Sequence, residues 1–98
     1  MAMKGLGELL DRLIEDQRAG PVHVCLLLAI WQSGERENRD GFFVIRRREL
    51  MRLAKIRGKT TYFRVIGDLA EWSYVEYWPS MAKEGKSRVR IACCLSEP

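Results

Sequence analysis

Apolar residues recur at helical spacing in two stretches of the first third of the chain. From Leu6 to Arg18 they stand three and four residues apart with charged residues between them, which predicts an amphipathic helix. Ala19-Gly20-Pro21 follows, and glycine favours a helix end while proline fits the first turn of the next helix. The second helix, Pro21 to Ser33, is apolar on nearly every side, so we expect it to be the central helix.

The middle of the chain begins with a polar connection. Gly34 to Gly41 ends in the turn residues Asn38-Arg39-Asp40-Gly41, which predicts a loop. A short strand follows at Phe42 to Ile45, and helical spacing returns from Arg46 to Ala54. This third helix is only about two turns long.

A tight turn, Lys55 to Gly58, leads into a fourth helix from Lys59 to Trp72. Ile56 fills the gap between the two helices, and Gly58 relieves the backbone. One face of the fourth helix is expected to enter the core, with Tyr62, Val65, Ile66, Leu69 and Ser73. The opposite face is small, polar and basic, with Thr60, Arg64, Gly67, Asp68 and Glu71, and with Lys59, Thr61 and Phe63 at its edges.

Near the end of the chain, apolar and polar residues alternate in two segments, which predicts a β-hairpin. Val75 and Tyr77 alternate with Tyr74, Glu76 and Trp78 in the first strand, Tyr74 to Trp78. The second strand, Arg88 to Cys93, directs Val89, Ile91 and Cys93 inward. The link from Pro79 to Ser87 carries a charged tip with Lys83, Glu84 and Lys86.

Length and composition limit these elements to one small domain. The chain has 98 residues, of which 47% are apolar and 31% charged, as in an average globular domain. We expect an α+β protein, mainly helical with a small β-hairpin. Its parts would be an N-terminal amphipathic helix at 1–18 that can serve dimerisation, a core domain at 19–94 and a tail at 95–98.

Charge is distributed unevenly along the chain. Residues 1–40 carry a net charge of −2 and residues 67–98 a net charge of −1, whereas residues 41–66 carry +7. The basic residues of this middle segment are Arg46, Arg47, Arg48, Arg52, Lys55, Arg57, Lys59 and Arg64. Such a segment indicates a surface for a polyanion, and the alternative is a solvated, arginine-rich helix face.

Residues with catalytic or metal-binding chemistry are few. The cysteines Cys25, Cys93 and Cys94 lack CxxC spacing, and we expect three buried, reduced thiols. His23 is expected to be a core or capping residue, and Asp11 and Glu15 to be solvated charges. No phosphate-binding glycine motif is present. We therefore expect a protein that is not an enzyme, with no metal, no cofactor and no small-molecule effector. The three tryptophans, Trp31, Trp72 and Trp78, are expected in the core.

The longest apolar run is too short for a membrane span. Val22 to Trp31 is interrupted by His23 and falls short of about 20 residues. The first residues lead into an acidic amphipathic stretch rather than the apolar core of a secretory signal. We expect a cytoplasmic protein.

The order of the elements, a helix, a short strand, two helices joined by a turn and a hairpin, is that of a winged helix-turn-helix domain. The chain resembles this family, and more narrowly small winged-helix regulators of Bacteroidetes genomes and mobile elements, over about residues 18–92. The segments that carry the resemblance are Gly20-Pro21, Glu49-Leu50-Met51-Arg52-Leu53-Ala54, Thr61-Tyr62, Leu69, Tyr74-Val75-Glu76-Tyr77-Trp78-Pro79-Ser80 and Gly85-Lys86-Ser87-Arg88-Val89. Ser73 departs from the family, which often has glycine after this helix.

The resemblance implies a recognition helix at about 59–72, lying in a DNA major groove, and a basic wing at about 80–88. It places Thr60, Thr61 and Arg64 nearest the base edges, with Arg64 as the residue most suited to read guanine. It assigns phosphates to Arg46, Arg47, Arg57 and Lys59, and a second backbone or minor-groove contact to Lys83, Lys86 and Arg88. Phe63 either touches a thymine methyl group or packs in the core.

These observations lead to one functional hypothesis and two alternatives. The first is a sequence-specific protein that binds double-stranded DNA and regulates transcription by occluding a site. We expect a homodimer, because the first two helices carry much apolar surface and a two-fold pair would match half-sites about 34 Å apart. The alternatives are an accessory DNA-binding factor of a mobile element, for excision or replication, and a winged-helix module that binds other proteins.

Overall fold

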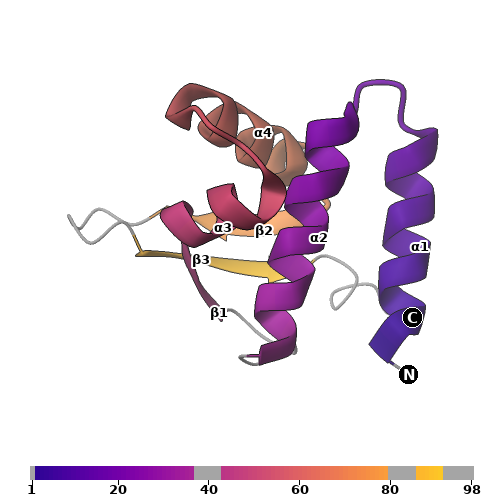
Figure 1. The fold of residues 1–98 in the computed structure, drawn as a ribbon. Helices are drawn as coiled ribbons and strands as arrows, with labels where there is room; N and C mark the ends of the chain where they lie inside the picture. Colours follow the sequence, from indigo (N-terminus) through magenta and orange to yellow (C-terminus); the bar gives the residue numbers. More distant parts are fainter. Residues whose placement is uncertain (1, 37–42, 80–85, 92–98) are drawn as a thin grey trace.

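Four helices and a three-stranded antiparallel sheet make up the part of the chain that the structure, a computed structural model, describes: residues 2–36, 43–79 and 86–91 (Figure 1). The elements are α1 (Ala2–Glu15), α2 (Pro21–Arg36), β1 (Phe43–Arg46), α3 (Arg47–Ala54), α4 (Lys59–Glu71), β2 (Val75–Trp78) and β3 (Lys86–Ile91). The chain is therefore an α+β protein, mainly helical with a small antiparallel sheet, as the sequence predicts.

The sheet has the order β1-β3-β2, so that β3 is central and pairs with both neighbours. The pairing of β2 with β3 is the expected hairpin. The pairing of β1 with β3 was not predicted, and it explains two strand limits. β1 continues to Arg46 and β3 begins at Lys86, not at Arg88 as expected, because these two residues are partners in the ladder.

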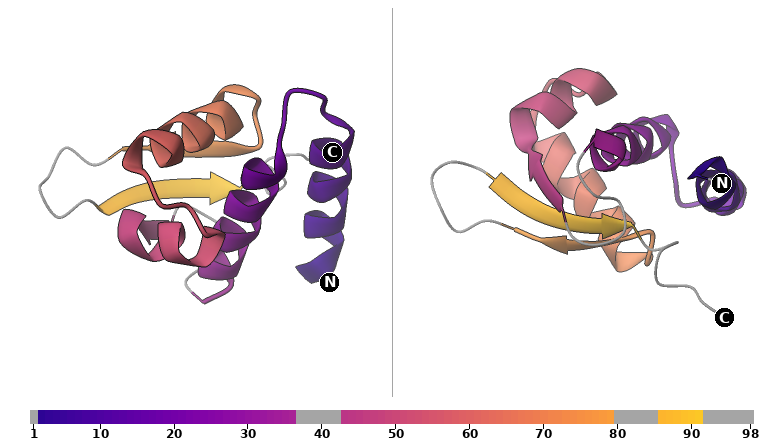
Figure 2. Two further views of the ribbon diagram at one scale, coloured as in Figure 1. Left: turned by 45° about the horizontal axis from the view of Figure 1, so that its top comes forward. Right: turned by 90° about the horizontal axis from the view of Figure 1, so that it is seen from below.

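The two faces of the sheet differ in burial. Side chains from all three strands lie buried on one face, among them Phe43, Val89 and Val75. The other face of the sheet includes the exposed side chains of Val44 and Trp78, and we call it the open face. Helices α3 and α4 pack on the buried face, and Figure 2 (right) shows the sheet nearest the viewer with both helices behind it.

Helix α2 is the central helix, as its apolar sequence predicts. It packs against α1, α3, α4 and β1, and Leu26, Leu27 and Ile30 are fully buried. Helix α1 contributes Leu9 and Leu13 to the same core. One side of α2 stays outside these contacts, and Cys25 and Leu28 are exposed there. The expectation of a buried thiol at Cys25 is therefore wrong, because four packed neighbours still leave one stripe of the helix uncovered.

Helix α1 ends at Glu15, three residues before the predicted end at Arg18. Asp16 causes this early end, because its Oδ1 accepts hydrogen bonds from the backbone amide of Arg18 at 3.0 Å and from the Arg18 Nε at 2.8 Å. The chain turns at once, with the amide of Ala19 donating to the Asp16 carbonyl. A side chain that binds its own backbone two residues on competes with the helix, which periodicity alone does not show.

Helix α2 continues to Arg36, beyond the end predicted at Ser33. Gly34 was interpreted as the first loop residue, but it lies buried inside the helix against the ring of Phe43. A Cβ atom at this position would stand 2.8 Å from the Phe43 ring. Gly34 is therefore required by the close approach of β1 rather than by a helix end.

Helices α3 and α4 are both followed by a residue with left-handed backbone conformation. After α3, Lys55 has φ 64°, and the amide of Ile56 donates to the Met51 carbonyl at 2.9 Å. After α4, Ser73 has φ 69°, and the amide of Tyr74 donates to the Leu69 carbonyl at 2.8 Å. Ser73 is thus exposed outside the helix instead of facing the core with Tyr62, Val65, Ile66 and Leu69, which are buried as predicted.

Two of the aromatic residues that the structure describes are exposed. Trp78 is 63% exposed and Phe63 is 49% exposed, because each projects from the side of its element that faces away from the core. The prediction of a core position was therefore right for Trp31, which is buried, and wrong for Trp78. Tyr74, placed with Trp78 by alternation, precedes β2 and is buried.

Some predictions fall outside the described residues. These are the turn at 38–41, the strand start at Phe42, the wing tip with Lys83, the thiols of Cys93 and Cys94, and the tail at 95–98. Within the described ranges, none of the helices has the length and apolar character that crossing a membrane requires.

Candidate nucleic-acid interface

The outward side of α4 carries the polar and basic residues that the sequence placed there. Thr60, Arg64 and Gly67 follow one another at helical spacing, and all three are exposed. The opposite side is fixed in the core by its buried residues, so this outward side is presented to solvent as a rigid surface. Lys59 and Phe63 are exposed beside it, and Thr61 is half-buried at its edge.

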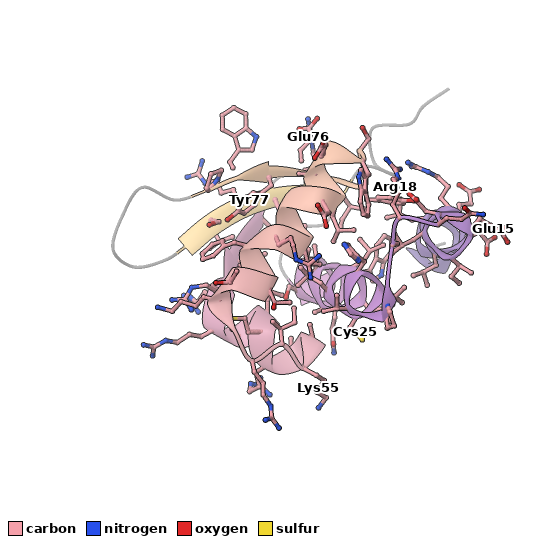
Figure 3. The ribbon with its side chains drawn as sticks, turned by 90° about the horizontal axis from the view of Figure 1, so that it is seen from above. Glu15, Arg18, Cys25, Lys55, Glu76 and Tyr77 are labelled. Atoms are coloured by element: carbon pink, nitrogen blue, oxygen red, sulfur yellow. The ribbon has the colours of Figure 1, made fainter. Side chains whose placement is uncertain are left out.

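The turn between α3 and α4 adds cations to the same end of the helix. Ile56 is buried and anchors the turn, while its neighbours Lys55 and Arg57 are exposed. In Figure 3, Lys55 projects outward from the end of α3, away from α1. Gly58 caps α4 without a side-chain hydrogen bond, so no side chain covers the first amides of the helix from this position.

Asp68 is the acidic residue next to Arg64, and its carboxylate faces two partners. Its Oδ2 lies 2.9 Å from the Nε2 of His23 and 3.8 Å from a guanidinium nitrogen of Arg64. His23 is almost fully buried, and its Nδ1 accepts the backbone amide hydrogen of Gly20 at 2.9 Å. The expected core or capping role of His23 is confirmed, and the pair holds Asp68 at the edge of the outward face of α4.

Arg46 and Arg47 are neighbours in sequence but belong to different elements. Arg47 begins α3, is half-buried, and points a guanidinium nitrogen at the sulfur of Met51 at 3.8 Å. Arg46 ends β1 and is exposed, and it alternates with the buried Ile45. Arg46 therefore belongs to the open face of the sheet.

Arg88 lies on the open face as well. It is exposed, and it is the ladder partner of both Val44 and Trp78, which are exposed too. Lys86 pairs with Arg46 one row further along the ladder. Lys83 lies outside the described residues.

The structure places the residues expected to contact DNA in two groups. One group lies on α4, its preceding turn and α3, and consists of Arg57, Lys59, Thr60, Thr61, Arg64 and Arg47. The other group, Arg46 and Arg88, lies on the far face of the sheet from α4. Strand alternation turns these two arginines away from the helices, so the structure does not bring them to the same side as the residues of α4.

The far end of α4 is closed by contacts to α1 and the α1–α2 connection. Arg18 lies over the ring of Trp72, with its guanidinium carbon 4.5 Å from the ring centroid, and Arg12 lies at the same distance over Tyr74. The Tyr74 hydroxyl donates to Asp16 at 3.0 Å. Hydrogen bonds from Arg18 hold the pKa of Asp16 well below its usual range. These paired groups stabilise the fold and leave the other end of α4 as the accessible one.

Other chemistry is sparse among the described residues. They contain no group of three or more histidine, cysteine or acidic side chains that could hold a metal ion. Burial raises the pKa of Tyr62 far above its ordinary value, so this phenol stays neutral in the core.

Three residues of these surfaces were missed or misplaced by sequence reasoning. The sequence analysis noted Lys55 as a basic residue but not as a site residue. It placed Asp68 on the polar face of the fourth helix without a specific role, and it placed Trp78 in the core. A signal existed for Asp68, which stands four residues after Arg64 and so on the same side of the helix. Nothing in the sequence pairs it with His23.

Comparison of the chain with protein-family models, with curated proteins and with solved structures found no match.

On the first two helices, Ile14 and Leu28 are exposed apolar residues. Homodimerisation stays a prediction.

Proposed function

We propose that this chain is a winged helix-turn-helix protein that binds double-stranded DNA and acts as a transcriptional regulator by occluding its site. The carrying observation is the composition of the outward side of α4. One end of this helix and the turn before it present Lys55, Arg57, Lys59 and Arg64, and the nearest acid, Asp68, is half-buried against His23. A helix face that is merely solvated has no need to expose its cations while its nearest acid is half-buried, whereas a surface that binds a polyanion does.

In this proposal α4 lies in the major groove. Arg64 reads a base edge, because a guanidinium can donate two hydrogen bonds to guanine, and Thr60 and Thr61 contribute hydroxyl contacts. Arg57, Lys59 and Arg47 bind phosphates on either side of the groove and fix the orientation of the helix without reading sequence. Asp68 keeps Arg64 on the outward face before DNA arrives.

The surrounding elements support the same assignment. A winged helix-turn-helix domain requires a short helix, a turn, a second helix and a β-hairpin, in this order. Here α3, a four-residue turn, α4 and the strands β2 and β3 follow one another in that order, and β3 also pairs with β1. In the proposal the wing lies at about 80–88, between β2 and β3 and in the start of β3, and a contact by Lys83 and Lys86 belongs to it.

The test is a salt series of binding to random-sequence duplex DNA. With Arg47, Arg57 and Lys59 on phosphates and one further contact by the wing, the logarithm of affinity should fall against the logarithm of salt concentration with a slope of about −4. Arg57→Ala should make the slope shallower by about one. Arg64→Ala should reduce the preference for a selected site by about 1–3 kcal/mol.

Lys4→Ala is the control, because it removes a positive charge from α1, outside the proposed interface. It should leave the slope unchanged. A wild-type protein that fails to bind at about 50 mM salt, or binds without salt dependence, contradicts the proposal and favours the protein-binding module instead.

A further inference from the structure

The open face of the sheet carries an exposed row that the proposed duplex site does not use. Val44, Arg88 and Trp78 are direct ladder partners across β1, β3 and β2. Trp78 is 63% exposed, Val44 is 41% exposed, and Arg88 is exposed between them. Directly opposed residues of neighbouring strands lie about 5 Å apart and share a face, so these three form one continuous strip.

The charge on this face is positive. Arg46, paired with Lys86, occupies the next row on one side of the strip. On the other side Arg90 pairs with Glu76 at 2.9 Å, which neutralises the acid. Among the strand residues that the structure describes, Glu76 is the only acidic one, so the strip lies in a field that attracts anions.

An exposed indole ring beside arginines has the chemistry that binds single-stranded nucleic acid. Unpaired bases stack on aromatic rings whatever their sequence, while cations follow the phosphates. Duplex DNA offers no free base faces to such a ring. An acidic peptide would use the arginines but would gain little from the indole ring.

We propose that the open face of the sheet binds single-stranded DNA, with a base stacked on Trp78 and phosphates bound by Arg88 and Arg46. This surface goes beyond the proposed function and stands on its own observations, since it lies on the opposite side of the sheet from α4. Together the two surfaces would suit a protein that holds a duplex and an adjacent separated strand.

The experiment measures binding of a fluorescently labelled oligothymidylate to the full chain by anisotropy at low salt. Trp78→Ala should weaken binding about fivefold or more, and Trp78→Phe should keep most of the affinity because it keeps a ring. Ile14→Ala is the control, since it removes an exposed apolar side chain from α1, outside both proposed surfaces, and should leave oligothymidylate binding unchanged. Arg88→Ala should weaken binding and reduce its salt dependence.

Each contrary result overturns the inference. No binding by the wild type, equal binding by Trp78→Ala, or an equal loss in Ile14→Ala rules out this surface. Tighter binding of oligouridylate would assign it to RNA, and competition by unlabelled duplex that depends on Trp78 would assign it to duplex DNA. Arg57→Ala separates the two proposals, because it should weaken duplex binding and spare oligothymidylate binding.

Discussion

At the scale of single residues, the structure depends on polar side chains that find partners far along the chain. His23 accepts the Gly20 amide at Nδ1, so its Nε2 carries the hydrogen and donates to Asp68, 45 residues away. Asp16 accepts hydrogen bonds from Arg18, its near neighbour, and from Tyr74, 58 residues away. Residue type predicted that His23 would be satisfied in the core or at a cap. It could not predict the partner, which only the packing of α2 against α4 supplies.

Asp16 makes the stability depend on pH in a direction that can be worked out. Hydrogen bonds from Arg18, and a weaker one from Tyr74, lower its pKa in the folded protein below the ordinary value of about 3.9. Its contribution is therefore present above about pH 4 and is lost as the pH falls below that value. Asp16→Asn should flatten the loss of stability between about pH 5 and about pH 2, followed by urea unfolding.

Asp11→Asn is the control for this experiment, because it removes an exposed carboxylate of α1. It should keep the wild-type dependence of stability on pH. A variant at Asp16 that unfolds in acid with the wild-type profile would show that another carboxylate controls the transition.

At the scale of elements, periodicity predicted every helix and strand that the structure describes, and it erred at their ends. The ends are set by local chemistry that periodicity does not contain. Asp16 closes α1 early, the ring of Phe43 keeps Gly34 inside α2, and Ser73 takes a left-handed conformation after α4. The absence of glycine at position 73 was visible in the sequence, and the positive φ of Ser73 is its structural counterpart.

Ser73→Gly should stabilise the protein, because glycine adopts a positive φ without the cost of about 1 kcal/mol that a side chain incurs there. The melting temperature should rise by a few degrees. Ser33→Gly, the same substitution inside α2, should lower it, because glycine weakens a helix interior. Changes of the same sign at both positions would contradict the backbone argument.

Gly67→Ala tests the surface role of α4 through two readouts. The new Cβ meets no atom within 4 Å, so the better helix former should raise stability by up to about 1 kcal/mol. If the outward side of α4 approaches DNA, the added methyl group should weaken duplex binding. Gly34→Ala should instead lower the melting temperature, because its Cβ would meet the buried ring of Phe43. Unchanged duplex binding in stabilised Gly67→Ala would place the DNA elsewhere.

At the scale of the whole molecule, charge is separated between two ends. Exposed acids of α1, Glu8, Asp11 and Glu15, lie on the opposite side of α2 from the cations of the α3–α4 turn (Figure 3). The division of charge along the sequence predicted this separation. It could not predict that Arg46 and Arg88 face away from α4, because that depends on which side of a strand enters the core and on the unpredicted pairing of β1 with β3.

The position of β3 between β1 and β2 also bears on the order in which the chain can fold. β1 ends at Arg46, and its ladder partner β3 begins 40 residues later, at Lys86. Contacts between residues this far apart in sequence form more slowly than the local contacts within helices. We therefore expect the ladder between β1 and β3 to form after the helices. A fragment that ends before Lys86 should leave the edge of β1 unpaired and open to pairing with another chain.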